Sequence, residues 1–165
     1  MQPINRTYDP VAVANFFIQK SLESGLEVTP MKLLKLVYIA HGWSLGLFGE
    51  PLINEAVVAW TYGPVIPDLY KVLKEYGRER VTKPVSKNGS SPFSFAPPTT
   101  PTVPIEDTTA RKLLESVWDA YGDKSGLHLS AITHKPGTPW SRTAPNDIIP
   151  QDLIKAHYKE LAKAS

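Results

Sequence analysis

One short pattern in the sequence could carry covalent catalysis. Residues 42–46 read GWSLG, which matches the G-x-S-x-G pattern of a nucleophile elbow with Ser44 as the attacking group. Such an elbow requires a strand, a strained turn and a helix within a β-sheet, with an acid and a histidine later in the chain. The residues before Ser44 instead form a capped helical pattern, and few segments could build the sheet. A serine hydrolase that uses Ser44 is therefore kept only as an alternative.

The four histidines, at positions 41, 128, 134 and 157, are the next candidates for chemistry. No two of them are three or four residues apart, so no helix face would present a pair of histidine ligands, and the H-E-x-x-H motif is absent. We therefore expect neither a metal site nor a cofactor. His41 lies within a continuous apolar run, which favours a hydrogen-bonded histidine in the core.

The composition is that of an ordinary folded protein. The chain has 165 residues, of which 42% are hydrophobic and 21% are charged, and this balance excludes wholesale disorder. It has no cysteine, which excludes disulfides, thiolate zinc sites and a cysteine nucleophile. The start MQPINRTYDP does not resemble a signal peptide, and no segment reaches the ~20 apolar residues of a membrane span. We expect a cytoplasmic protein with no membrane contact.

A run of basic residues lies near the middle of the chain. Its members are Lys71, Lys74, Arg78, Arg80, Lys83 and Lys87, opposed nearby by Asp68, Glu75 and Glu79. Such a run can face nucleic acid or an acidic partner, but it is more often the solvated end of a helix. The net charge of +2 is too small to favour nucleic acid, and no glycine-rich phosphate loop accompanies the run. Nucleic acid is therefore not the expected partner.

Residues 59–70 read AWTYGPVIPDLY, which places three aromatic side chains around two prolines. Residues that precede a proline favour extended backbone, which predicts a stiff segment over 63–66 before a helix that opens at Pro67. Aromatic side chains on rigid backbone lose little freedom on binding, and Trp and Tyr are enriched in interface hot spots. We expect Trp60 to pack in the core, where Trp60→Ala would cost about 3–5 kcal/mol. The role of Tyr62 stays open at this level.

These side chains must be positioned by a mainly helical fold. Asp9 with Pro10, and Thr29 with Pro30, each combine an N-cap residue with proline at the first helical position. The helix after Thr29 has apolar residues around nearly its full circumference, which predicts a central, buried helix. The pattern indicates a compact bundle of about six helices, which begin near residues 10, 30, 67, 108, 127 and 150.

The segment 83–104 interrupts this helical pattern with six prolines and a cluster of Ser and Thr residues. Proline at this density breaks helices and central strands, so we predict an exposed loop or a ragged hairpin in which RVTKPV pairs with PFSFAP across Asn88 and Gly89. Neither half of the chain looks self-sufficient, because the C-terminal apolar stripes need a partner surface. We therefore expect one domain over residues 1–165.

Several motifs resemble those of a known family. Residues 29–77 are similar to the signature region of the Panacea-domain family, also described as SocA-like or phage-associated GepA-like proteins. The shared motifs are KLLKLVYIAHGW, GEPL, AWTYGPVIPDLY and, further on, LSAITHKPGTPW at residues 129–140. Within these motifs we assign a structural role to His41, Trp43, Trp60, His134 and Trp140.

The resemblance implies an antitoxin. Family members typically sit beside a toxin gene in bacterial or prophage two-gene operons and are thought to neutralise varied toxins by direct contact. No catalytic residue or cofactor belongs to the family pattern, so none is carried over to this chain. A DNA-binding transcriptional regulator and a phage-associated adaptor protein are the alternative functions.

The resulting hypothesis is a helical domain that masks a toxin with a surface around the Gly-Pro-Val turn. The segment 83–104 and the basic run are further candidate specificity elements. The expected partner-binding residues are Tyr62, Gly63, Pro64, Val65, Tyr70, Lys74, Arg78 and Arg80. The sequence leaves open the identity of the toxin, the stoichiometry, and whether the toxin is blocked or delivered to a protease.

Overall fold

The computed structural model describes residues 6–88, 93 and 95–164. Within these residues there are six α-helices, so the predicted mainly α architecture is confirmed. The helices are α1 (Pro10–Ser24), α2 (Pro30–Phe48), α3 (Pro67–Leu73), α4 (Thr108–Tyr121), α5 (Gly126–His134) and α6 (Gln151–Ala164). Two single turns of 3-10 helix, Lys74–Tyr76 and Trp140–Arg142, follow α3 and α5.

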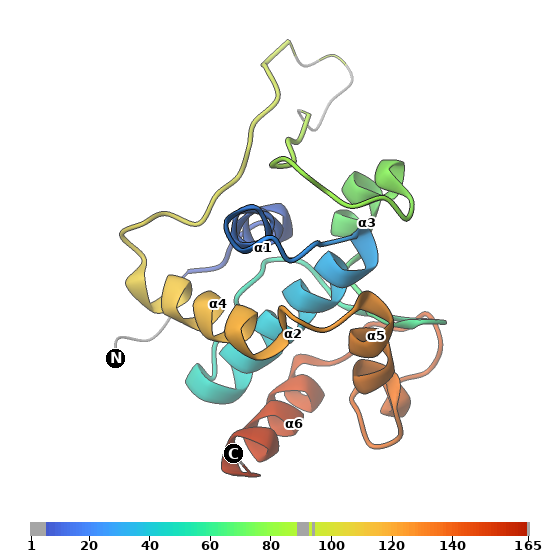
Figure 1. Ribbon diagram of the computed structural model, residues 1–165. Helices are drawn as coiled ribbons and strands as arrows, with labels where there is room; N and C mark the ends of the chain where they lie inside the picture. The colour runs from blue at the N-terminus through green and yellow to red at the C-terminus, as the bar shows by residue number, and fades with distance from the viewer. Residues whose placement is uncertain (1–5, 89–92, 94, 165) are drawn as a thin grey trace.

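Helix α2 passes through the middle of the molecule, and the other helices pack around it (Figure 1). The Thr29 hydroxyl caps its first turn by accepting a hydrogen bond from the Lys32 backbone N–H at 3.3 Å. Gly49 ends the helix in the left-handed conformation, with a φ of +74°. Most residues between these caps are buried on every side, so the prediction of a central helix is confirmed.

Helix α6 lies directly against α2 because two glycines of α2 leave room for it. A Cβ atom at Gly42 would lie 2.2 Å from the Tyr158 ring, and one at Gly46 would lie 2.8 Å from the carbonyl carbon of Tyr158. The two glycines are four residues apart and so share one helix face. The G-x-S-x-G pattern therefore reflects a close contact between two helices.

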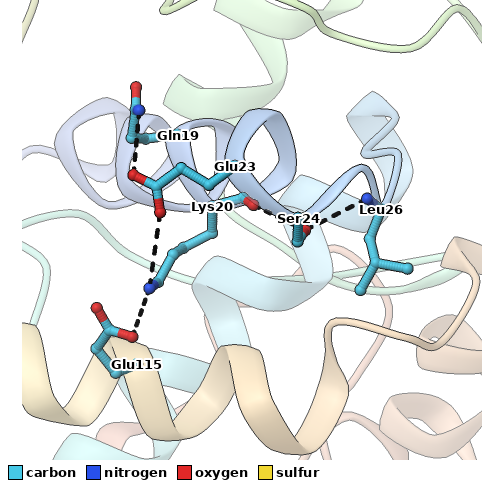
Figure 2. A network of polar contacts seen from close by, with 6 residues as sticks. All are labelled: Gln19, Lys20, Glu23, Ser24, Leu26 and Glu115. Carbon is cyan, nitrogen blue, oxygen red and sulfur yellow. Dashed lines mark hydrogen bonds and ion pairs between the residues drawn. The ribbon is translucent and has the colours of Figure 1, made fainter.

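Helices α1 and α4 are joined by apolar stacking and by an ion pair. Phe17 of α1 stacks on Trp118 of α4, with the ring centroids 6.3 Å apart. Figure 2 shows Lys20 of α1 reaching Glu115 of α4, where the ammonium nitrogen and a carboxylate oxygen are 2.6 Å apart. The carboxylate of Glu23, one turn along α1, lies 3.9 Å from the same ammonium group. These contacts fix α1 against α4.

The one sheet in the described part of the chain is a two-stranded antiparallel hairpin. It consists of β1 (Val58–Trp60) and β2 (Gly63–Val65), with Trp60 opposite Gly63. The backbone of β1 also bonds to the segment 146–149 on its other side. The sequence predicted extended backbone for β2, which is confirmed, but it did not predict that this segment pairs with β1.

The described parts of the segment 83–104, residues 83–88, 93 and 95–104, extend from the helical body in Figure 1 and are anchored by Asn15 of α1. The buried Asn15 amide donates to the carbonyls of Val85 and Pro101, and it accepts from the Val85 N–H at 2.7 Å. One antiparallel bridge joins Lys87 to Thr99. Lys87 and Thr99 each lie two residues C-terminal to the segments predicted to pair, RVTKPV at 80–85 and PFSFAP at 92–97. The predicted turn at Gly89 lies outside the described residues.

Two other expectations concern membranes and metals. Among the residues that the structure describes, no helix is both long enough and apolar enough to cross a membrane. The same residues contain no group of three or more histidine, aspartate and glutamate side chains placed to hold a metal ion.

Candidate partner-binding surface

The hairpin, the start of α2 and helix α3 enclose a surface groove of about 250 Å³, named here the aromatic groove. It is lined by Pro30, Met31, Leu34, Lys35, Trp60, Tyr62, Val65, Tyr70, Lys74 and Gly77. The fold therefore gathers four of the expected partner-binding residues in one place, namely Tyr62, Val65, Tyr70 and Lys74.

Two of the three aromatic side chains that line this groove are exposed. Tyr62 is 73% exposed at the turn of the hairpin, and Tyr70 is 41% exposed on α3. Trp60 is half-buried and packs edge-to-face on Tyr70, with the ring centroids 5.1 Å apart. Because Trp60 is only half-buried, we expect Trp60→Ala to cost less than the ~3–5 kcal/mol of a fully buried ring.

A buried lysine of α2 holds the hairpin by two hydrogen bonds. The Lys35 ammonium group donates to the carbonyl oxygens of Tyr62 at 3.1 Å and Pro64 at 3.0 Å. Lys35 is 2% exposed, and this burial lowers its pKa to about 8. Both the charged and the neutral amine can donate to these carbonyls. The lysine thereby satisfies acceptors at the outer edge of β2, where a further strand would otherwise pair.

The motif LSAITHKPGTPW supplies two more donors to the same hairpin. The Ser130 hydroxyl of α5 donates to the Tyr62 carbonyl at 2.8 Å, and the Trp140 indole N–H donates to the Trp60 carbonyl at 2.6 Å. The His134 ring lies edge-to-face on Trp140, with the ring centroids 5.3 Å apart. Trp140 therefore holds the backbone of β1 directly, and His134 packs on the Trp140 ring.

Gly63 is required at the point where Lys35 approaches the hairpin. Its φ is +113°, a conformation that residues with a side chain rarely adopt. A Cβ atom at this position would also lie 2.9 Å from the Lys35 ammonium nitrogen. Gly63 and the adjacent Pro64 are buried, so their contribution to the surface is to shape the turn that displays Tyr62.

A second hollow of about 470 Å³ adjoins the aromatic groove and is named here the side groove. It is lined by Thr29, Met31, Gly77, Arg78, Ser125, Gly126 and Leu127, of which Met31 and Gly77 also line the aromatic groove. Arg78 is exposed on its rim, and Leu127 is 76% exposed. The expected partner-binding residue Arg78 thus lies next to the aromatic groove.

Two other members of the basic run, Arg80 and Lys87, form ion pairs within the protein. Arg80 pairs with Glu27 at 2.8 Å, and both side chains are mostly exposed. Lys87 pairs with Asp9 at 2.6 Å, at the base of the segment 83–104. Arg80 lines neither groove, so the structure does not bring this expected residue together with the others.

Ser44, the residue that suggested a nucleophile, belongs to the core instead. Ser44 is fully buried within α2, and its hydroxyl donates to the Glu50 carbonyl at 2.6 Å. It does not lie on a turn between a strand and a helix, so the nucleophile elbow considered from the sequence is wrong. The Trp43 indole donates to the Tyr121 hydroxyl at 3.1 Å and packs on Tyr158.

His41 has the role that the sequence predicted. It is 1% exposed, and its Nδ1 atom accepts a hydrogen bond from the Leu52 backbone N–H at 3.2 Å. Burial lowers its pKa to about 4, so the ring is neutral at neutral pH and can act as an acceptor.

The sequence analysis missed the two lysines of the KLLKL segment. Both are buried: Lys35 holds the hairpin, and Lys32 donates to the carbonyls of Glu27 and Gly122. A lysine within an otherwise apolar helix must find acceptors when it is buried, and this was the available signal. Ser130 was also missed, since a single serine on a short helix gives no such signal.

The chain matches one family of known proteins. Residues 33–141 match the family described as Antitoxin SocA-like, Panacea domain, and the chain belongs to this family. The matched region contains the hairpin together with Lys35, Ser130 and Trp140, which hold it.

The chain is also similar to a protein that is named as an antitoxin. The chain is 29% identical to Antitoxin SocA of Caulobacter vibrioides (strain NA1000 / CB15N) over 136 residues, which cover 82% of this chain and 70% of that protein. No solved structure matches the chain.

Proposed function

We propose that this protein is an antitoxin that neutralises a cognate toxin, encoded by an adjacent gene, by direct contact at the aromatic groove. Membership of the antitoxin family supports a toxin as the partner and suggests a role without catalysis. The observation that carries the choice of surface is the exposed Tyr62, displayed on a turn whose carbonyl accepts from both Lys35 and Ser130.

The physical advantage of this surface is its rigidity. The backbone that carries Tyr62 is already held by hydrogen bonds from Lys35 and Ser130, so it has little conformational entropy to lose on binding. The ring contact between Trp60 and Tyr70 fixes the neighbouring side chains in the same way. We propose that the complex forms in the cytoplasm, where both partners are made.

Co-expression with the neighbouring reading frame in a bacterial host tests this proposal. We expect the neighbour alone to arrest growth, and the wild-type protein to restore growth and to co-purify with it. Tyr62→Ser should lose rescue. Ile105→Ser is the matched control, because Ile105 is 77% exposed and lines neither groove.

Three outcomes would count against the proposal. A harmless neighbour removes the toxin, and rescue without co-purification removes direct contact. Equal rescue by Tyr62→Ser and Ile105→Ser removes the aromatic groove. A salt-dependent shift of operator DNA by the protein alone would instead favour a DNA-binding regulator.

A further inference from the structure

The two grooves share one sign of charge. Lys35, Lys74 and Arg78 are the charged side chains that line them, and no acidic side chain does so among the residues that the structure describes. Lys74 and Arg78 are exposed, and neither forms an ion pair with the described part of the chain. Two free cations therefore border the surface that Tyr62 displays.

Exposed apolar side chains line the same two grooves. Tyr62, Tyr70, Met31 and Leu127 are 73%, 41%, 37% and 76% exposed, and all of them line one groove or the other. Exposed apolar side chains that gather in one patch typically mark an interaction site. The aromatic groove, at about 250 Å³, is smaller than the ~300–1,000 Å³ of small-molecule sites, so it suits one bulky side chain of a partner.

A partner strand has no free edge of the hairpin to pair with. The backbone of β1 already bonds to the segment 146–149 on its outer side. On the side of β2, the carbonyls of Tyr62 and Pro64 accept from Lys35, and Pro64 has no N–H to donate. Recognition must therefore use side chains, since main-chain pairing is blocked.

We propose that the segment of the toxin bound here is an acidic peptide with a bulky apolar anchor. The anchor enters the aromatic groove beside Trp60 and Tyr70, and Asp or Glu residues near it pair with Lys74 and Arg78. This inference rests on the proposed function, because it names the chemistry of the partner at the same site.

The same cations could attract nucleic acid, but their small number disfavours it. Proteins that bind duplex DNA tightly neutralise many phosphates, on the order of 6–10, whereas two free cations line these grooves. A single acidic peptide segment needs no more than two.

Selection from a random peptide library displayed on phage tests the inference without the toxin. The target is the full-length wild-type protein, and the counter-target is the double variant Lys74→Glu, Arg78→Glu. We expect enriched peptides that place Asp or Glu beside Trp, Phe or Leu. The best synthetic peptide should bind the double variant at least about tenfold more weakly and should lose affinity as salt is raised.

Lys112→Glu, Lys159→Glu makes the same change of charge at two exposed positions outside both grooves and should bind the peptide like the wild type. Failure to enrich peptides, enrichment of basic peptides, or equal binding to both double variants would overturn the inference. Displacement of the peptide by a single-stranded oligonucleotide of 20 nucleotides would assign the surface to nucleic acid.

The toxin complex is scored separately by co-purification. Enriched acidic peptides without a toxin complex would leave the groove chemistry standing and refute the proposed function. A toxin complex whose affinity is unchanged by Lys74→Glu, Arg78→Glu would support the proposed function and refute the acidic-peptide inference.

Discussion

At the scale of single residues, the structure depends on polar side chains buried at the centre of an apolar helix. Lys35 donates to two carbonyls at the outer edge of the hairpin, and His41 accepts from the Leu52 backbone N–H in the loop that follows α2. Each side chain satisfies backbone groups that would otherwise be buried without a partner. The backbone geometry of the candidate site is thus set partly by a buried side chain of α2.

The lysine can be tested by titration. Burial penalises the charged form of Lys35, so we expect ¹³C NMR of the labelled lysine Cε to give a pKa of about 8, with Lys35→Arg used to assign the resonance. Between pH 8 and the ordinary lysine pKa of about 10.5, the unfolded chain binds more protons than the folded one. The contribution of Lys35 to the free energy of unfolding should therefore rise with pH over this interval. Titration near the ordinary value would contradict the buried position.

His41 should make the free energy of unfolding depend on pH in the acidic range. The pKa of His41 is lowered to about 4, so between pH 6.5 and pH 4 the unfolded chain binds the extra proton. Its contribution to stability should fall as pH drops through this interval, by about 1.4 kcal/mol per unit of pKa difference. His41→Asn keeps an acceptor for the Leu52 N–H without titrating, and denaturant unfolding at several pH values should show a flatter acid limb. An unchanged limb would show that other groups control acid unfolding.

At this scale the sequence predicted His41 well and Lys35 not at all. An apolar run around one histidine indicates a core histidine whatever its partner is. The partners of Lys35 are carbonyls 27 and 29 residues away, and nothing local indicates where they lie. Such contacts are defined only when the elements are packed together.

At the scale of elements, the contact between α2 and α6 decides how the C-terminal helix docks. Gly42 and Gly46 let the ring and backbone of Tyr158 approach α2 more closely than any side chain would allow. Glycine lowers the stability of an isolated helix by about 1 kcal/mol relative to alanine. Its presence twice on one face therefore indicates that the packing outweighs this loss.

Gly42→Ala distinguishes helix propensity from packing, because the two effects change the free energy of unfolding in opposite directions. If helix propensity decided the outcome, the variant would be more stable by up to ~1 kcal/mol. We expect destabilisation by about 1–3 kcal/mol, because the new methyl group would overlap the Tyr158 ring. Unfolding in urea measures the difference. The loss should shrink in a Tyr158→Ala background, and a loss that stays constant there would contradict a direct contact.

The helices were predictable because their caps and stops are local. Asp9 with Pro10, and Thr29 with Pro30, define helix starts that the structure confirms. The hairpin was not predicted because its strands have three residues each, too few to show an alternating pattern. The Asn88–Gly89 pair in the segment 83–104 drew attention instead, since such pairs favour hairpin turns.

At the scale of the whole molecule, a stable helical body presents a small surface with distinct chemistry. The buried apolar residues form one cluster that includes α2 and the hairpin, so the groove rests directly on the core. Family membership supports the antitoxin role, and the exposed aromatic residues beside free cations support the proposed site. The sequence predicted four of the ten residues that line the aromatic groove, and the common location of all ten depends on how α2, α3 and the hairpin meet.

The affinity of the purified toxin for Tyr62→Ser, measured by isothermal titration calorimetry beside Ile105→Ser, tests the central claim most directly. Tyr62 behaves as an interface hot spot if the account is right, so its loss should cost at least about 2 kcal/mol, with the melting temperature unchanged. Ile105→Ser should bind like the wild type. Equal dissociation constants for the two variants would show that the toxin binds elsewhere on this protein.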